Sequence, residues 1–113
     1  MPRFLLLLHR PSSTVSGDSP EELRERIGRY RAWREEMTRA GKILAGEKLA
    51  AGGFRLRRDG AEALVADADG DRDVISGYFL LQADNEREAR EIAGRCPHLE
   101  SGGTIELRQI EPT

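Results

Sequence analysis

Hydrophobic and polar residues fall along the chain in blocks that predict strands and helices. The first apolar block, residues 4–8, is a phenylalanine followed by four leucines and has the length of a strand. A strand with one face in solvent alternates apolar and polar residues, so this unbroken run predicts a strand covered on both faces. Residues 74–83 predict a second strand of the same kind. Its larger side chains divide between two faces, with Ile75, Phe79 and Leu81 on one and Tyr78 and Leu80 on the other.

Two helices are predicted from capping signals and apolar spacing. Ser19 is placed as an N-cap before Pro20, and Glu22 completes a capping box. This helix should run to about Ala40 and end at Gly41, because glycine favours the left-handed conformation that terminates helices. A second helix is expected over residues 85–95, ended by Pro97. The first helix has an apolar stripe at spacings of three and four, formed by Leu23, Ile27, Tyr30, Trp33, Met37 and Ala40.

The remaining segments predict shorter strands. One can begin at Ile43, alternating residues 54–58 and 63–66 predict a hairpin around Asp59-Gly60, and residues 104–110 predict a last strand. The order of these elements is a split βαβ pattern, in which two helices lie on one face of an antiparallel sheet. The sequence therefore predicts an α+β fold of the ferredoxin-like type, as a single domain over residues 1–113.

The second face of this sheet also needs a cover. Two helices cover one face only, yet both central strands are apolar on both faces, and a chain of 113 residues offers no further element. A second copy packed sheet against sheet is the simplest cover, so we predict a symmetric homodimer. The alternative is that a few apolar residues remain in solvent, as they do in many monomers.

Composition and charge exclude several classes of protein. The chain has 18 basic and 20 acidic residues and a net charge of −2, without the basic excess of a nucleic-acid binder. Cys96 is the only cysteine, which excludes an internal disulfide and the usual zinc sites and fits a reducing compartment. The run over residues 4–8 is too short for a signal peptide or a membrane span. We expect a cytoplasmic protein with no membrane or nucleic-acid partner.

An ordered set of segments carries a family resemblance. It consists of residues 4–9, the capped helix from Ser19 through Trp33 to Gly41, and residues 46–49, 74–79, 95–97 and 102–108. Together these segments resemble the YCII-related proteins, and among them the branch named for its Asp-Gly-Pro-Phe motif. The resemblance implies a ferredoxin-like fold that dimerises as an α+β barrel. The motif should lie near Asp67, where the chain reads Asp-Ala-Asp-Gly, so only Asp67 matches.

The resemblance also implies roles. In the wider family a His–Asp pair has been proposed as catalytic, and one relative looks like a dehydrochlorinase. The usual histidine of that pair has no counterpart in the first helix of this chain, which contains no histidine. Members of the branch are often encoded near sigma factors of the extracytoplasmic type, which implies a regulatory setting, and most of them have no settled biochemical role.

His9 is the first candidate for catalysis. It follows the first apolar run, and the neighbouring antiparallel strand should start near Val74, which places His9 near Asp73 or Ser76 and within reach of Asp67. A histidine held by a carboxylate acts as a general base near neutral pH. The alternative is a strand-end histidine without a catalytic role. Ser76 has no His–Asp motif around it and is not predicted to be a nucleophile.

Other side chains are candidates for binding. An aromatic pocket with one carboxylate between helix and sheet would suit a small organic ligand. Its predicted lining is Trp33, Tyr30, Glu47, Ser76 and Tyr78. The alternative is ordinary core packing, in which tryptophan and tyrosine find polar partners at the edge of the core.

Two further features receive structural interpretations. Alternating aspartates resemble a Ca²⁺ or Mg²⁺ loop but lack the bidentate glutamate of an EF-hand, so we predict a solvated acidic loop and no metal or cofactor. Cys96 lies at the end of the second helix, where nothing lowers a thiol pKa, and is predicted to be inert. His98 is expected at the surface. The alternating aspartates of the acidic loop are Asp67, Asp69, Asp71 and Asp73.

The sequence thus leads to three functional hypotheses. The first is a protein that binds a small organic molecule in the cleft between sheet and helix. The second is a cofactor-free lyase, isomerase or hydrolase that uses His9 with Asp73 or Asp67. The third is a regulatory interaction protein that acts beside a transcription factor of the sigma type.

Overall fold

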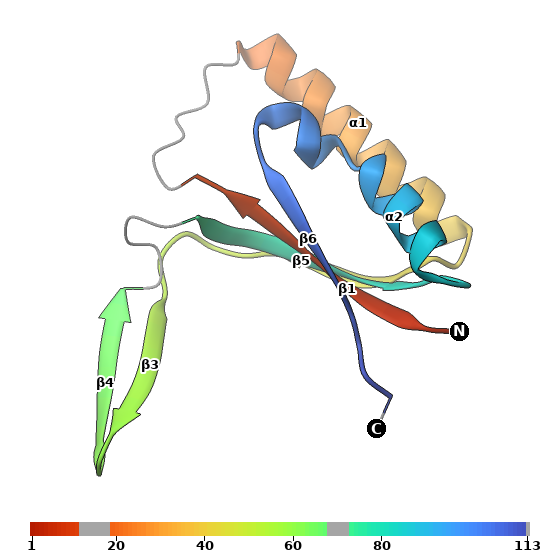
Figure 1. Cartoon of the computed structure of the whole chain (residues 1–113). Coiled ribbons are helices and arrows are strands. Elements are labelled where there is room, and N and C mark those ends of the chain that lie inside the picture. Colours follow the sequence, from red (N-terminus) through yellow and green to blue (C-terminus); the bar gives the residue numbers. More distant parts are fainter. Residues whose placement is uncertain (12–18, 68–72, 113) are drawn as a thin grey trace.

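A computed structural model describes residues 1–11, 19–67 and 73–112 of the chain, and Figure 1 shows its elements. In chain order these are β1 (Arg3–Arg10), α1 (Pro20–Arg39), β2 (Ile43–Lys48), β3 (Phe54–Asp59), β4 (Glu62–Asp67), β5 (Val74–Gln82), α2 (Glu86–Gly94), the 3₁₀ helix η1 (Pro97–Ser101) and β6 (Thr104–Gln109). Within these ranges no helix combines the length and the apolar character needed to cross a membrane.

The main sheet has four strands in the order β2-β5-β1-β6, and each pair of neighbours is antiparallel. β1 and β5 are the two central strands, as their unbroken apolar runs predict. Both helices lie on the same side of the sheet (Figure 1). This is the predicted ferredoxin-like α+β arrangement, with the β3–β4 hairpin inserted between the second and third strands of the main sheet.

The two faces of the sheet differ in their cover. On the face beneath the helices, here called the helix face, Phe4, Leu6 and Leu8 of β1 and Phe79 and Leu81 of β5 are buried. The intervening side chains point the other way, because successive strand residues alternate between faces. We call that second side the open face. Cross-strand register places these residues on it: Leu5, Leu7, His9, Ala45, Glu47, Tyr78, Leu80, Glu106 and Arg108.

A bulge changes the alternation near the start of β5. Leu8 pairs with Gly77, but the next residue of β1, His9, pairs with Ile75, so Ser76 is an extra residue in β5. The Ser76 hydroxyl donates to the Leu8 carbonyl at 3.3 Å. Ile75 therefore lies on the side of His9 and is 42% exposed. The prediction that Ile75 shares a face with Phe79 and Leu81 is wrong, because regular alternation takes no account of a bulge.

Helix α1 begins and ends where its capping residues predict. The Ser19 hydroxyl accepts a hydrogen bond from the Glu22 backbone N–H at 3.2 Å, and the chain leaves the helix through Gly41, which has a φ of 75°. The predicted apolar stripe is only half covered. Trp33 and Met37 are buried, whereas Leu23 and Ile27, which lie nearer the N-terminus of the helix, are exposed.

Aromatic packing joins α1 to the sheet and to α2. The Trp33 ring meets the Phe79 ring edge-on, with centroids 5.2 Å apart, and Tyr30 packs against both rings. The Trp33 indole N–H donates to the backbone carbonyl of Ile92 in α2 at 3.2 Å. An ion pair of 2.7 Å between Lys42 Nζ and Glu88 Oε1 links the turn before β2 to the first turn of α2.

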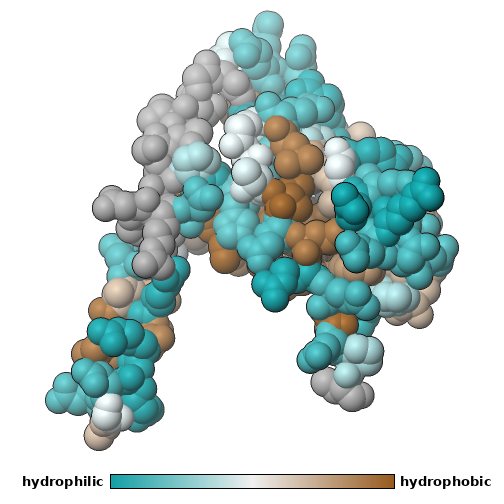
Figure 2. Space-filling view, viewed as in Figure 1, coloured by the Kyte–Doolittle hydropathy of each residue, from teal (hydrophilic) through white to brown (hydrophobic). Residues whose placement is uncertain are grey.

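The β3–β4 hairpin forms a separate two-stranded sheet. Asp59 pairs with Glu62, so the two-residue loop is Gly60-Ala61, one position later than predicted, and Gly60 adopts the positive φ of 60° that this tight loop requires. The hairpin projects from one end of the main sheet and stands apart from the rest of the protein (Figures 1 and 2). The sequence pattern predicted both strands but did not predict their separation from the main sheet.

Candidate functional site on the open face

His9 and Glu106 form an ion-pair contact on the open face. His9 Nε2 lies 3.2 Å from Glu106 Oε1, and the two side chains are 19% and 42% exposed. They come from adjacent strands, since β1 pairs with β6, and Glu106 stands diagonally across from His9 beside Leu7. The pair lies near the C-terminal end of β1, and both side chains keep some exposure to solvent.

Electrostatics fix the direction of this hydrogen bond. Arg108 donates to the second Glu106 oxygen, Oε2, at 3.1 Å. The hydrogen bond from Arg108 is the main cause that holds the pKa of Glu106 below its usual value. Desolvation acts in the opposite direction and raises this pKa, while the contact with His9 lowers it further. An ionised carboxylate only accepts hydrogen bonds, so the hydrogen must lie on His9 Nε2. In the neutral imidazole this leaves the Nδ1 lone pair as a proton acceptor.

The neighbours of the pair are apolar or aromatic. Leu7 is half-buried between Tyr78 on β5 and Glu106 on β6, and Ile75 lies opposite His9. Glu47 faces Tyr78 from β2, so it shares the open face at the far side of β5. The open face thus presents a His–Glu pair with Arg108 beside it, and a further carboxylate at Glu47, around a half-buried apolar centre.

The structure places the predicted carboxylate partners of His9 elsewhere. Asp73 is exposed and precedes Val74, which pairs with Arg10 rather than with His9. Asp67 ends β4 and pairs with Phe54 in the separate hairpin. The carboxylate that contacts His9 is Glu106, which the sequence reasoning missed.

Strand register was the missing information for Glu106. Because Ile105 and Leu107 face one side of the last strand, Glu106 had to face the other. Only the pairing of β1 with β6 then shows that Glu106 lies on the same face of the sheet as His9. A sequence pattern gives the alternation within a strand, but it does not give the neighbour of that strand.

The single aromatic pocket predicted between helix and sheet is not assembled. Tyr30 and Trp33 pack on the helix face, where their contacts with Phe79 fill the space between α1 and the sheet. Glu47 and Tyr78 face each other on the open face. The two pairs are on opposite sides of the sheet, because Tyr78 and Phe79 are consecutive strand residues. Ser76, the fifth predicted residue, lies in the bulge beside His9 and donates to Leu8.

His98 is half-buried and holds the end of β1, so the prediction of a surface position is wrong. Its Nε2 lies 2.7 Å from the backbone carbonyl oxygen of His9, and because a carbonyl only accepts, Nε2–H donates. The ring occupies space that a side chain at Gly103 would need, since an added Cβ there would meet it at 2.2 Å. His98 therefore fixes the backbone of His9 from the η1 turn.

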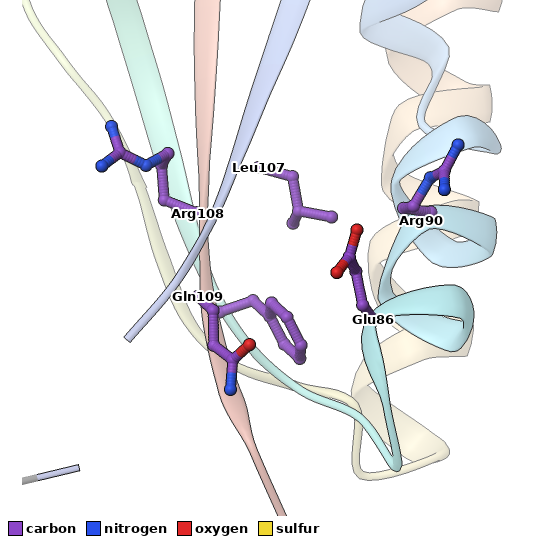
Figure 3. Close-up of a pocket in the computed structure, with 6 residues that line it drawn as sticks. Glu86, Arg90, Leu107, Arg108 and Gln109 are labelled. Atoms are coloured by element: carbon purple, nitrogen blue, oxygen red, sulfur yellow. The ribbon is translucent and has the colours of Figure 1, made fainter. Parts of the chain in front are cut away.

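A cavity of about 360 Å³ lies between α2 and β6. Figure 3 shows Leu107 pointing toward α2, with Glu86 and Arg90 across from it. Phe4, Arg108 and Gln109 complete the lining. None of the six lining residues is a predicted site residue, although the location between sheet and helix agrees with the first functional hypothesis.

The acidic segment gives no metal site in the part of the chain that the structure covers. Asp67 and Asp73 flank it, while Asp69 and Asp71 lie outside the described residues. Among the described residues no group of three or more histidine, cysteine or carboxylate side chains is placed to hold a metal ion.

Cys96 should resist thiol reagents in the folded protein. Its side chain is 2% exposed, and burial raises the pKa of the thiol to about 11. We expect Ellman's reagent at pH 8 to label the native protein at least about 100-fold more slowly than the protein in guanidinium, because the reactive thiolate is rare and enclosed in the fold. Rapid labelling without denaturant, at the rate of a free thiol, would contradict the burial of this residue.

Comparisons with known proteins place the chain in a family. No curated protein matches its sequence significantly. Among solved structures, 5-chloro-2-hydroxyhydroquinone dehydrochlorinase from Burkholderia phenoliruptrix, in complex with 2,5-dihydroxybenzoquinone, aligns over 96% of this chain and 95% of its own, with 19% identity and a TM-score of 0.48. A protein of Arabidopsis thaliana aligns over 100% of this chain and 96% of its own, with 13% identity and a TM-score of 0.39. The family model described as the YCII-related domain matches residues 2–113, and the chain therefore belongs to the YCII-related family.

Proposed function

We propose that this protein is a homodimer that joins through the open face of its sheet and binds a small organic molecule beside His9 and Glu106. The observation that carries the proposal is the His9–Glu106 contact of 3.2 Å on a sheet face that no helix of the described chain covers. Both helices pack on the opposite side, and the space beneath α1 is filled by aromatic rings.

The apolar centre of the open face supports the proposed dimer, because no helix of the described chain covers it. Leu5 and Leu7 of β1 and Tyr78 and Leu80 of β5 form adjacent cross-strand pairs at the centre of the open face. Contiguous apolar surface of this kind is uncommon on monomers and marks an interaction site. A second copy brings a matching apolar face, because a two-fold interface joins the same patch of both subunits. His9 then lies near the margin of the contact, where a small molecule has access from the end of the sheet.

The side chains at the His9 end define the chemistry of the ligand. The Nδ1 lone pair of His9 accepts a proton or a hydrogen bond, while Leu7 and Tyr78 provide an apolar and aromatic surface. A small aromatic or enolic molecule with an acidic hydroxyl group satisfies both requirements. Glu47 and Arg108 supply further polar groups at the two sides of the same face.

Proton transfer is a second candidate function for the same site. Glu106 holds His9 with Nε2–H toward the carboxylate and stabilises the imidazolium that forms when Nδ1 takes a proton. This is the arrangement of a general base backed by a carboxylate. It supports a cofactor-free lyase, isomerase or hydrolase with His9 as the base, and Asp73 and Asp67 stay proposed contributors from the same end of the sheet.

The cavity between α2 and β6 is the alternative place for a ligand. Its volume of about 360 Å³ falls in the range of small-molecule pockets, and Arg90 suits a carboxylate group above the apolar floor of Phe4 and Leu107, whereas the Arg108 guanidinium is held by Glu106 on the open face. This location agrees with binding between sheet and helix, without a role for His9.

A titration followed by NMR separates the two locations. We expect catechol and phenol, as probes with acidic hydroxyl groups, to shift the ring resonances of His9 and Tyr78 with a dissociation constant of order 1 mM, as fits molecules of this size. Glu106→Gln should weaken binding at least about 5-fold, because the carboxylate no longer orients the imidazole. Glu100→Gln is the matched control, since Glu100 pairs with Arg29 on the surface, away from the open face.

Either of two results would contradict the open-face site. One is the absence of saturable shifts at His9 with both probes. The other is a set of shifts confined to Phe4 and Leu107, which would move the ligand to the cavity between α2 and β6. The assignment to the Asp-Gly-Pro-Phe branch, the cytoplasmic location and a regulatory partner stay predictions from the sequence.

A further inference from the structure

We infer that the β3–β4 hairpin is an arm that packs its apolar face on a second copy of this chain and enlarges the sheet-to-sheet interface. The inference rests on the proposed dimer and adds to it a second contact surface, formed by residues outside the main sheet. Three features support it: the apolar residues on one face of the hairpin, the isolation of the hairpin from the body of the protein, and the number of contact residues that a stable dimer needs.

The hairpin has two unlike faces. Leu56 and Val65 are cross-strand partners and are 65% and 59% exposed, and Phe54 lies on the same face at 75% exposure. Arg58 and Asp67 border these three residues on the same face. The opposite face carries the other charged residues of the hairpin around Leu64, namely Arg55, Arg57, Asp59 and Glu62. Figure 2 shows apolar residues on the surface of the projecting hairpin. Three large apolar side chains in a row on one face indicate a contact surface.

The isolation of the hairpin indicates that its partner is another molecule. β3 and β4 pair with each other and make no extensive contact with any other element of the described chain. The radius of gyration is 16.1 Å, whereas a compact domain of about 100 residues has a value near 13 Å. A two-stranded hairpin alone in water is marginally stable at best. Packing of its apolar face against a second chain would provide the missing stabilisation.

The area of the interface identifies that second chain as another copy. The four strands of the main sheet contain 29 residues, and because strand residues alternate between faces, about half of them lie on the open face, whereas a standard interface uses about 20–30 residues per partner. One face of the hairpin adds about six residues, and the partner's arm covers further surface on this copy. The sheet face and the arms together therefore reach the size of a stable dimer, which the sheet face alone does not.

The position of the arm ties it to the proposed site. β2 ends at Lys48 opposite Gly77, and β5 begins at Val74 opposite Arg10, so the hairpin leaves the sheet at the end that carries His9. It extends toward the side of the sheet away from the helices (Figure 1). The contact that the arm makes with the second copy thus borders the His9 end of the open face.

The arm is tested by the dimer dissociation constant, measured by sedimentation equilibrium. The double variant Leu56→Ser with Val65→Ser should raise the dissociation constant at least about 100-fold, since each copy loses two apolar side chains that the dimer buries. The matched control, Arg57→Ser with Leu64→Ser, changes the adjacent cross-strand pair on the opposite face and should change it less than about 3-fold. Trp33 fluorescence reports whether the body of each variant stays folded.

Hydrogen exchange gives a second readout. The hairpin amides should be protected in the dimer and should exchange at least about 10-fold faster in Leu7→Glu, which replaces a residue at the centre of the open face. One outcome separates the two proposals: the wild type dimerises, Leu7→Glu dissociates the dimer, and the hairpin double variant leaves the dissociation constant unchanged. In that case the proposed contact of the arm is wrong and the sheet-to-sheet dimer stands. If the wild type is a monomer at every concentration, both the arm and the proposed dimer are wrong.

Discussion

Replacing Trp33 by alanine should lower the free energy of unfolding by about 3–5 kcal/mol, the usual cost of truncating a buried aromatic side chain. Trp33 is 6% exposed, packs edge-on against Phe79, and joins α1 to α2 through its hydrogen bond to Ile92. Alanine removes the ring, opens a cavity and leaves the Ile92 carbonyl without this donor. Since a domain has only about 5–15 kcal/mol of stability in total, the variant should be largely destabilised.

Two companion variants separate the parts of this effect. Trp33→Phe keeps most of the apolar volume and should cost roughly 1–3 kcal/mol, through the smaller ring and the loss of one hydrogen bond to the Ile92 carbonyl, which keeps its bond from the Arg95 backbone N–H. Arg31→Ala, at an exposed position of the same helix, should stay within about 0.5 kcal/mol of the wild type. Urea unfolding followed by circular dichroism, at one fixed protein concentration because dimerisation adds to stability, measures all three. A loss below about 1 kcal/mol for Trp33→Ala would show that the ring is not part of the core.

Leu7→Glu should dissociate the dimer while each protomer stays folded. Leu7 lies at the centre of the open face, between Tyr78 and Glu106, and is only half-buried within one protomer. In the protomer a glutamate there remains in contact with water, but in the dimer it is buried beside Glu106 without a partner. Burying an unpaired charge costs several kcal/mol, which corresponds to a dissociation constant raised at least about 1000-fold.

Leu99→Glu is the matched control for this substitution. Leu99 is 43% exposed on the η1 turn, so the same chemical change is made outside the open face, and the dimer should remain intact. Light scattering gives the mass of each variant, and circular dichroism confirms the fold. Loss of the dimer in both variants, or in neither, would contradict an interface through the open face.

The sequence predicted those parts of the fold that local chemistry determines. Ser19 and Glu22 marked the start of α1 and Gly41 its end, because capping involves residues a few positions apart. The unbroken apolar runs identified β1 and β5 as the central strands, since two covered faces need apolar residues at every position. Cys96 was predicted to be inert from its place at the end of the second helix, and its burial at 2% exposure agrees with that prediction.

The features that it missed depend on pairing between distant segments. The bulge at Ser76 turned Ile75 to the open face, and the pairing of β1 with β6 brought Glu106 to His9. The β3–β4 hairpin is separate because β2, β5, β1 and β6 pair with one another in the main sheet, and β3 and β4 pair only with each other. Tyr30 and Trp33 have the composition of a ligand pocket, and only the position of Phe79 shows that their rings fill the core.

Sedimentation velocity of the purified protein shows whether a second copy covers the apolar open face, on which the dimer and the proposed site both depend. We predict one species with twice the 12.6 kDa mass of the chain at micromolar concentration, which dissociates only on strong dilution. A single species of 12.6 kDa that persists up to roughly 100 μM would contradict the proposed dimer, because the open face would then stay uncovered at every working concentration.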